Sequence, residues 1–81
     1  MENSGDQFVA DINAEGKHLR LRSEVTKDGA RAVVYNMDAK EEILNDLVGN
    51  LEEGREKCEE CVKGLLTEPI EIEWMHHQAA A

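Results

Sequence analysis

The sequence has few of the residues that most directly signal a catalytic function. Aromatic side chains make up 4% of its 81 residues, with one Phe, one Tyr and one Trp, and there is a single proline. Its six glycines stand apart from one another, which excludes a glycine-rich loop that could cradle a phosphate. No serine or threonine lies in a recognisable nucleophile motif. We therefore expect no catalytic residues, no enzyme activity and no cofactor.

Positive charge is also scarce. Nine Lys and Arg residues stand against 18 Asp and Glu, giving a net charge of −9. Proteins bind the nucleic-acid backbone or an anionic membrane surface through Lys and Arg, so a chain of this charge is unsuited to either. The composition favours a protein partner with a basic surface instead.

Long apolar runs are absent as well. No segment approaches the roughly 20 apolar residues that a membrane-spanning helix needs. The first residues, Met1 to Asp6, are polar and acidic, unlike a signal peptide. We expect a cytoplasmic protein whose two cysteines are reduced thiols.

The length allows one domain with one hydrophobic core. We expect a disordered leader at residues 1–6, a single α+β domain at residues 7–75 and a tail at residues 76–81. The last three residues, Ala79-Ala80-Ala81, are consistent with a vector-derived scar.

Apolar and polar side chains alternate along residues 7–37, which is typical of half-buried strands. Turn signals at residues 15–17 and 27–29 divide this segment into three runs, and the Asp-Gly pair in the second turn is a strong hairpin signal. The sequence therefore predicts an antiparallel three-stranded meander. The side chains expected to face inward include Phe8, Ala10, Ile12, Ala14, Leu19, Leu21 and Val25.

After Asp38 the apolar residues recur in steps of three and four, the pattern of an amphipathic helix. Asp38 stands three residues before Glu41, the spacing of an N-terminal capping box. Pro69 disfavours helical geometry in the residue before it. The pattern predicts one long helix from about Ala39 to Leu66.

A continuous helix of this length would extend about 42 Å, too far to cover only three short strands. Either its far end packs against another subunit, or the helix breaks between Gly49 and Gly54 into two helices that fold back, since glycine disfavours a helix interior by about 1 kcal/mol. We expect the continuous helix and a homodimer formed through its apolar seam. The seam residues expected at the oligomer interface are Leu44, Leu47, Leu51, Cys58 and Leu65.

Beyond Pro69, Ile70, Ile72 and Trp74 alternate with glutamates. This alternation predicts a short C-terminal strand from Ile70 to Trp74. The strand could pair with the sheet of its own chain or of a neighbouring subunit.

Cys58 and Cys61 could be read as a redox or metal motif. A redox role is disfavoured because the neighbouring glutamates oppose formation of a thiolate. His76 and His77 could complete a four-ligand zinc site, but the spacing differs from that of familiar zinc modules. We expect both cysteines to be small core residues and no metal to be bound.

The acidic residues of the predicted helix lie opposite its apolar seam. Two interpretations of these acidic residues are open. They form either a solvated face that promotes solubility or a docking face for a basic protein. The basic protein could be one that binds nucleic acid, whose binding site the acidic face would occupy as an electrostatic mimic. The residues expected to bind the partner are Glu42, Asp46, Glu52, Glu53, Glu56, Glu59, Glu60 and, as an aromatic anchor, Trp74.

In overall profile, a short acidic chain with a small sheet and a helix is similar to many virus-encoded inhibitors of host defence, anti-CRISPR proteins among them. This resemblance of profile implies a non-enzymatic inhibitor or adaptor that binds a protein in the cytoplasm. One alternative is a structural homo-oligomer held together by the helix seam. A second is a small zinc-binding module built on Cys58, Cys61, His76 and His77.

Overall fold

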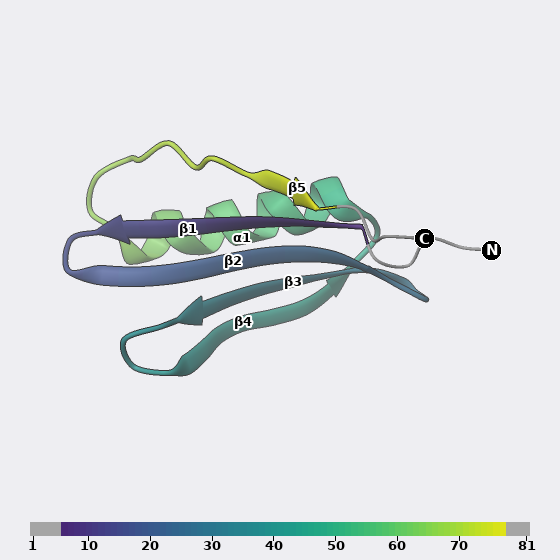
Figure 1. The fold of residues 1–81 in the computed structure, drawn as a ribbon, viewed down its shortest axis with the longest axis horizontal. Helices are drawn as coiled ribbons and strands as arrows, with labels where there is room; N and C mark the ends of the chain where they lie inside the picture. Colours follow the sequence, from purple (N-terminus) through teal and green to yellow (C-terminus); the bar gives the residue numbers. More distant parts are fainter. Residues whose placement is uncertain (1–5, 78–81) are drawn as a thin grey trace.

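A computed structural model of the chain describes residues 6–77 and shows an α+β fold. A single antiparallel sheet is covered on one face by one helix (Figure 1). Along the sheet the strand order is β4-β3-β2-β1-β5. The elements are β1 (Gln7–Ala14), β2 (Lys17–Thr26), β3 (Gly29–Asn36), β4 (Glu41–Val48), α1 (Leu51–Leu65) and β5 (Met75–His77). Within the described residues, no helix has the length and apolar character needed to cross a membrane.

The predicted meander is confirmed as β1, β2 and β3. The first turn consists of Glu15 and Gly16, both with positive φ, as the tight connection of a two-residue hairpin requires. The second turn leads into Gly29, which also has positive φ and lies close to the backbone of Val48. The prediction of three strands was wrong, because a fourth long strand, β4, extends the sheet beyond β3.

That fourth strand occupies the first part of the predicted helix. Residues 41–48 pair antiparallel with β3, and the continuous helix over residues 39–66 is therefore wrong. Their apolar spacing suits a helix, but β3 is buried on both faces at Val33 and Val34 and needs a backbone partner along its outer edge. Pairing with β3 overrides the local preference of this segment.

Asp38 is not a helix cap. One of its carboxylate oxygens accepts a hydrogen bond from the backbone N–H of His18, at 3.2 Å. Asn36 Oδ1 accepts hydrogen bonds from the backbone N–H groups of Asp38 and Ala39 and shapes the reversal between β3 and β4. Lys40, with a φ of 54°, completes the reversal into β4.

Helix α1 begins where glycine and asparagine interrupt the pattern. Asn50 is its N-cap, and the side chain of Asn50 accepts a hydrogen bond from the backbone N–H of Glu53 at 2.9 Å. Glu53 reaches back to the backbone N–H of Gly49 at 2.7 Å. The break at Gly49-Asn50 therefore separates a strand from a helix, where sequence analysis considered two helices.

Gly54 does not break the helix. It lies in the buried stripe of α1 with Cys58 and Val62 and packs directly against Ser23 of β2. Ser23 is fully buried, and its hydroxyl donates a hydrogen bond to the backbone oxygen of Leu51 at 2.9 Å. A glycine at position 54 lets the helix approach β2 closely enough for this bond to form.

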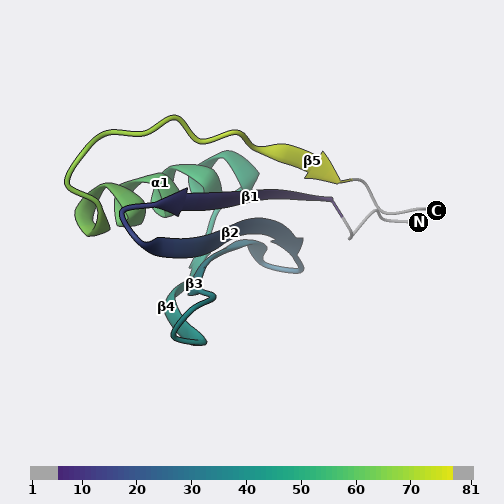
Figure 2. The same cartoon turned by 60° about the vertical axis from the view of Figure 1, so that its left-hand side comes forward.

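The core lies between α1 and the inner face of β1, β2 and β3. The predicted inward residues Ala10, Ile12, Leu19 and Leu21 are buried, which confirms the period-two interpretation of these strands. The complete cluster comprises Ala10, Ile12, Leu19, Leu21, Ala32, Val34, Cys58, Val62 and Leu66. Figure 2 shows the β3–β4 hairpin turning away from α1, so the helix leaves much of β4 uncovered.

The C-terminal segment does not form the predicted strand at residues 70–74. The chain instead runs back beside β1 without regular structure and then forms β5, which pairs with residues 7–9 of β1 (Figure 1). His76 and His77, which sequence analysis assigned to the tail, lie in this strand. Residues 1–5 of the predicted leader and 78–81 of the predicted tail, including its alanine scar, lie outside the described residues.

Glu15 fastens the start of that segment. Its carboxylate accepts hydrogen bonds from the backbone N–H groups of Thr67 and Glu68, each at 3.1 Å. These bonds, that from Thr67 above all, hold the pKa of the Glu15 carboxyl below its ordinary value of 4.5.

Replacing Gly54 should loosen the packing between helix and sheet. In Gly54→Ala the added methyl group overlaps Ser23 Oγ, so we expect the free energy of unfolding to fall by about 1–3 kcal/mol. Gly64→Ala is the matched control, because a Cβ at position 64 would meet nothing within 4 Å beyond its chain neighbours and the backbone of its own helix. Its free energy of unfolding should be unchanged or rise by up to about 1 kcal/mol. Urea denaturation measures both. A Gly54→Ala protein as stable as the wild type would contradict the close approach.

Glu15 should make stability depend on acid pH. Because its pKa is lower in the folded than in the unfolded state, its stabilising contribution is complete above the ordinary value of 4.5 and is lost as the pH falls through the folded pKa. Titration of the side-chain carboxyl by NMR should give a midpoint below 4.5, with the amide signals of Thr67 and Glu68 moving over the same range. Glu15→Gln should abolish that movement, and a midpoint at or above the ordinary value would contradict the assigned bonds.

Candidate functional site

The outward face of α1 carries a row of carboxylates. Glu52, Glu53, Glu56 and Glu60 are exposed and lie on the side of the helix opposite Gly54 and its buried stripe. Helical spacing places them along about 12 Å of the helix axis. We call these four residues the acidic helix face.

Four other residues expected at that face lie elsewhere. Glu42 and Asp46 belong to β4, because the segment that holds them is a strand. Glu59 is half-buried and accepts a hydrogen bond from the indole Nε1 of Trp74 at 2.9 Å. Trp74 is also half-buried, and it packs against the core of its own chain. The prediction that Trp74 anchors a partner stays a prediction.

The acidic helix face is not neutralised by neighbouring bases. Among the described residues, the ion pairs shorter than 4 Å involve the carboxylates of Asp11, Glu24 and Asp46. Lys57 of α1 lies 3.9 Å from Asp46 of β4, and in the described residues it forms no ion pair with a glutamate of the acidic helix face. Glu53 also has a structural role, because its carboxylate accepts the hydrogen bond from the backbone N–H of Gly49 beside the N-terminus of the helix.

A groove runs between the acidic helix face and β4. Its volume is about 400 Å³. Its lining residues are Leu47, Val48, Glu53, Glu56, Lys57 and Glu60. Since β4 was interpreted as part of the helix, sequence analysis missed this groove. The only sequence signal for it was Gly49-Asn50, which marks the chain reversal that places helix beside strand.

A second, smaller groove of about 290 Å³ lies between the end of α1 and the segment that follows it. Apolar side chains from both segments line it, including Val62, Leu66, Pro69 and Ile72, and its charged lining residues include Lys63 and Glu59. The hydrogen bond from Trp74 to Glu59 helps to hold this segment against the helix.

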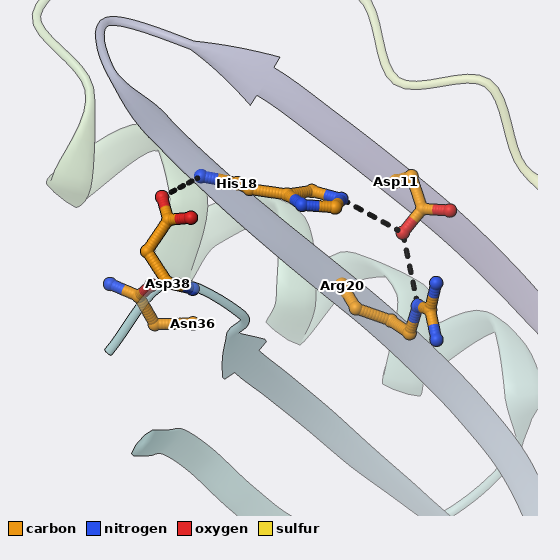
Figure 3. Close-up of polar contacts among 5 residues, drawn as sticks. All are labelled: Asp11, His18, Arg20, Asn36 and Asp38. Atoms are coloured by element: carbon orange, nitrogen blue, oxygen red, sulfur yellow. Dashed lines mark hydrogen bonds and ion pairs between the residues drawn. The ribbon is translucent and has the colours of Figure 1, made fainter. Parts of the chain in front are cut away.

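The face of the sheet opposite α1 is charged but internally paired. Asp11 of β1 accepts a hydrogen bond from Arg20 Nε at 3.0 Å, and its carboxylate lies 3.9 Å from His18 Nε2 (Figure 3). Arg22 lies 3.4 Å from Glu24. The pairing of these bases with acids depends on the cross-strand register, which sets Asp11 opposite Arg20. In the part of the chain that the structure describes, this face therefore presents no unpaired row of one charge.

Cys58 is a core residue, as expected. Its side chain is fully buried, with Sγ 3.6 Å from the backbone oxygen of Arg22 and 3.5 Å from that of Val33. Burial raises the pKa of the Cys58 thiol to about 11, and burial also raises the pKa of the half-buried Cys61. The two thiols form no disulfide.

The structure gives no support to the zinc alternative. His76 stacks on the ring of Phe8 at a centroid distance of 4.7 Å, and Arg55 lies over the same ring at 4.2 Å. Within residues 6–77, no group of three or more His, Cys, Asp or Glu side chains is arranged to hold a metal ion.

The apolar seam expected at an oligomer interface does not exist as one surface. Leu44 and Leu47 lie on β4, because residues 41–48 are a strand. Cys58 is buried inside its own chain, while Leu44 and Leu65 are half-buried against the same core. Leu51 is half-buried in the first turn of α1. Self-association stays a prediction, but a continuous helical seam cannot be its cause.

No protein-family description, no curated protein sequence and no solved structure matches this chain.

The two cysteines should differ in reactivity. At mildly alkaline pH an alkylating reagent should label the more exposed Cys61 first, and Cys58 should react slower by about tenfold or more, because it is inaccessible and its thiolate is disfavoured. Mass spectrometry of the single-cysteine variants Cys58→Ser and Cys61→Ser measures each rate separately. Adding urea should remove the difference. Rapid labelling of Cys58 in the folded protein would contradict its place in the core.

Proposed function

We propose that this chain is a non-enzymatic protein-binding module that docks the acidic helix face on a basic surface of its partner. Small inhibitors and adaptors act in this way, and a partner that binds nucleic acid would have its own site occupied. The observation that carries the proposal is the row of exposed glutamates that no base of the described chain neutralises.

The physical basis of such binding is electrostatic complementarity. A surface of one charge steers an oppositely charged partner during encounter and disfavours wrong partners. The four glutamates supply about one charge per 4 Å of helix axis, close to the roughly 3.4 Å per phosphate of one DNA strand. This density supports mimicry of a nucleic-acid strand toward a basic groove.

The thiols are consistent with a cytoplasmic site of action. Cys58 and Cys61 form no disulfide, as is usual where glutathione and thioredoxin keep thiols reduced. The proposed setting is the cytoplasm, or the host cytoplasm if the protein is viral.

Reversing the charge of the helix face should abolish partner capture. The variant carrying Glu52→Lys, Glu56→Lys and Glu60→Lys removes three exposed carboxylates that make no ion pair in the described chain. We expect the proteins captured by the wild type from cells of the source organism to be lost from this variant, as measured by quantitative mass spectrometry. Capture by the wild type should weaken as salt is added, because salt screens exposed charges.

A matched variant separates the position of the charges from their number. Glu68→Lys, Glu71→Lys and Glu73→Lys together change the net charge equally, at exposed positions of the C-terminal segment. This control should retain the captured proteins, and circular dichroism should show both variants folded. Equal capture by the two variants would overturn the proposal.

A further inference from the structure

Strand β4 is an open edge of the sheet. It lies at the end of the strand order, and no other strand of residues 6–77 pairs with its outer side. None of its eight residues is buried: six are exposed, and Leu44 and Val48 are half-buried. Unpaired backbone N–H and C=O groups on such an edge are a template for another strand.

The usable part of this edge begins after an irregularity. The register with β3 shifts between Val34 and Tyr35, so the strand is bulged near Ile43. From Leu44 to Val48 the pairing is regular. Five residues of strand span about 16 Å, enough for a short extended segment to pair alongside.

The two faces of this edge differ in chemistry. Asp46 lies on the face that α1 covers, because its partner in β3 is the buried Ala32. Next to it lies the groove with Glu53, Glu56 and Glu60, where Lys57 is the only base among the lining residues. By the strand register, the side chain of Leu47 lies on the opposite face and is 54% exposed, while the residue also borders the groove. A strand added here would meet carboxylates on one face and an apolar side chain on the other.

We propose that the outer edge of β4, from Leu44 to Val48, binds an extended basic segment of the partner protein by strand addition. The side chains of that segment alternate between basic residues, which lie over the groove beside Asp46, and apolar residues, which cover Leu47. The inference rests on the proposed function and names the form in which the basic partner is recognised. Main-chain hydrogen bonds supply affinity, and the acidic groove selects the charge.

Charge complementarity separates this occupant from a second copy of the chain. Strand β4 carries Glu41, Glu42 and Asp46 and no base. Pairing of two copies along this edge would bring two sets of these acids, and two acidic grooves, into one interface. Like charges in a strand pair are destabilising, whereas a basic segment neutralises them.

A basic peptide can test strand addition directly. The probe is an octapeptide that alternates lysine with valine or threonine, compared with the same peptide N-methylated at every backbone nitrogen. Amide NMR at low salt should show the parent peptide binding, with slowed hydrogen exchange for amides between Leu44 and Val48. The N-methylated peptide keeps its charge and side chains but cannot donate backbone hydrogen bonds. We therefore expect its affinity to be lower than that of the parent peptide by at least about tenfold.

Two charge variants test the groove. Glu56→Lys with Glu60→Lys should weaken binding of the parent peptide by about fivefold or more, since each lost ion pair and each new repulsion contributes a fraction of a kcal/mol. Glu71→Lys with Glu73→Lys is the control of equal charge change, at exposed positions outside the groove. This control should weaken binding of the parent peptide less than the groove variant does.

The outcomes separate this inference from the proposed function. Equal binding of the two peptides, or chemical-shift changes confined to α1, would overturn strand addition while leaving the acidic helix face as a docking surface. If the parent peptide does not bind, strand addition is overturned as well. The proposed function is then decided by the capture experiment alone. Protection of β4 amides that rises with protein concentration, together with a dimer in sedimentation, would assign the edge to a second copy and overturn the inference.

Discussion

The contact between α1 and the centre of the sheet is the interaction on which the rest of the structure depends. Gly54 brings the helix backbone against Ser23, and Cys58 and Val62 fill the space above β2 and β3. Because a helix has one apolar stripe, burying this side turns the opposite side to solvent. The direction in which the acidic helix face points follows from this packing.

The same contact decides what stays uncovered. A helix of 15 residues extends for about 23 Å and packs mainly on β2 and β3, so the outer strand β4 receives little cover. The C-terminal segment, fastened by Glu15 and by the bond from Trp74 to Glu59, returns to the opposite edge of the sheet as β5. One edge is thus occupied by the chain's own end and the other is open, beside the groove that carries the carboxylates.

Charge follows the same division. The bases of the outer sheet face lie beside carboxylates in the same sheet, as Arg20 lies beside Asp11, so this face is largely self-compensated. The acidic helix face has no such compensation in the described residues. The net charge of −9 therefore describes the helix side of the molecule better than the sheet side. The exposed glutamates of α1 could be recognised from periodicity, because that part of the helix was correctly predicted.

Local pattern determined the elements whose signals are local. Residue spacing and turn chemistry predict strands β1 to β3 and the turns between them. They also predict the burial of Leu19 and Leu21, the position of Cys58 in the core and the exposure of the glutamates of α1. Only the tertiary structure decided that residues 41–48 form a strand, because their apolar spacing fits a helix and the backbone of β3 offers a better partner. The open edge of β4 and its groove arise from that long-range pairing, of which the local sequence marks only the chain reversal at Gly49-Asn50.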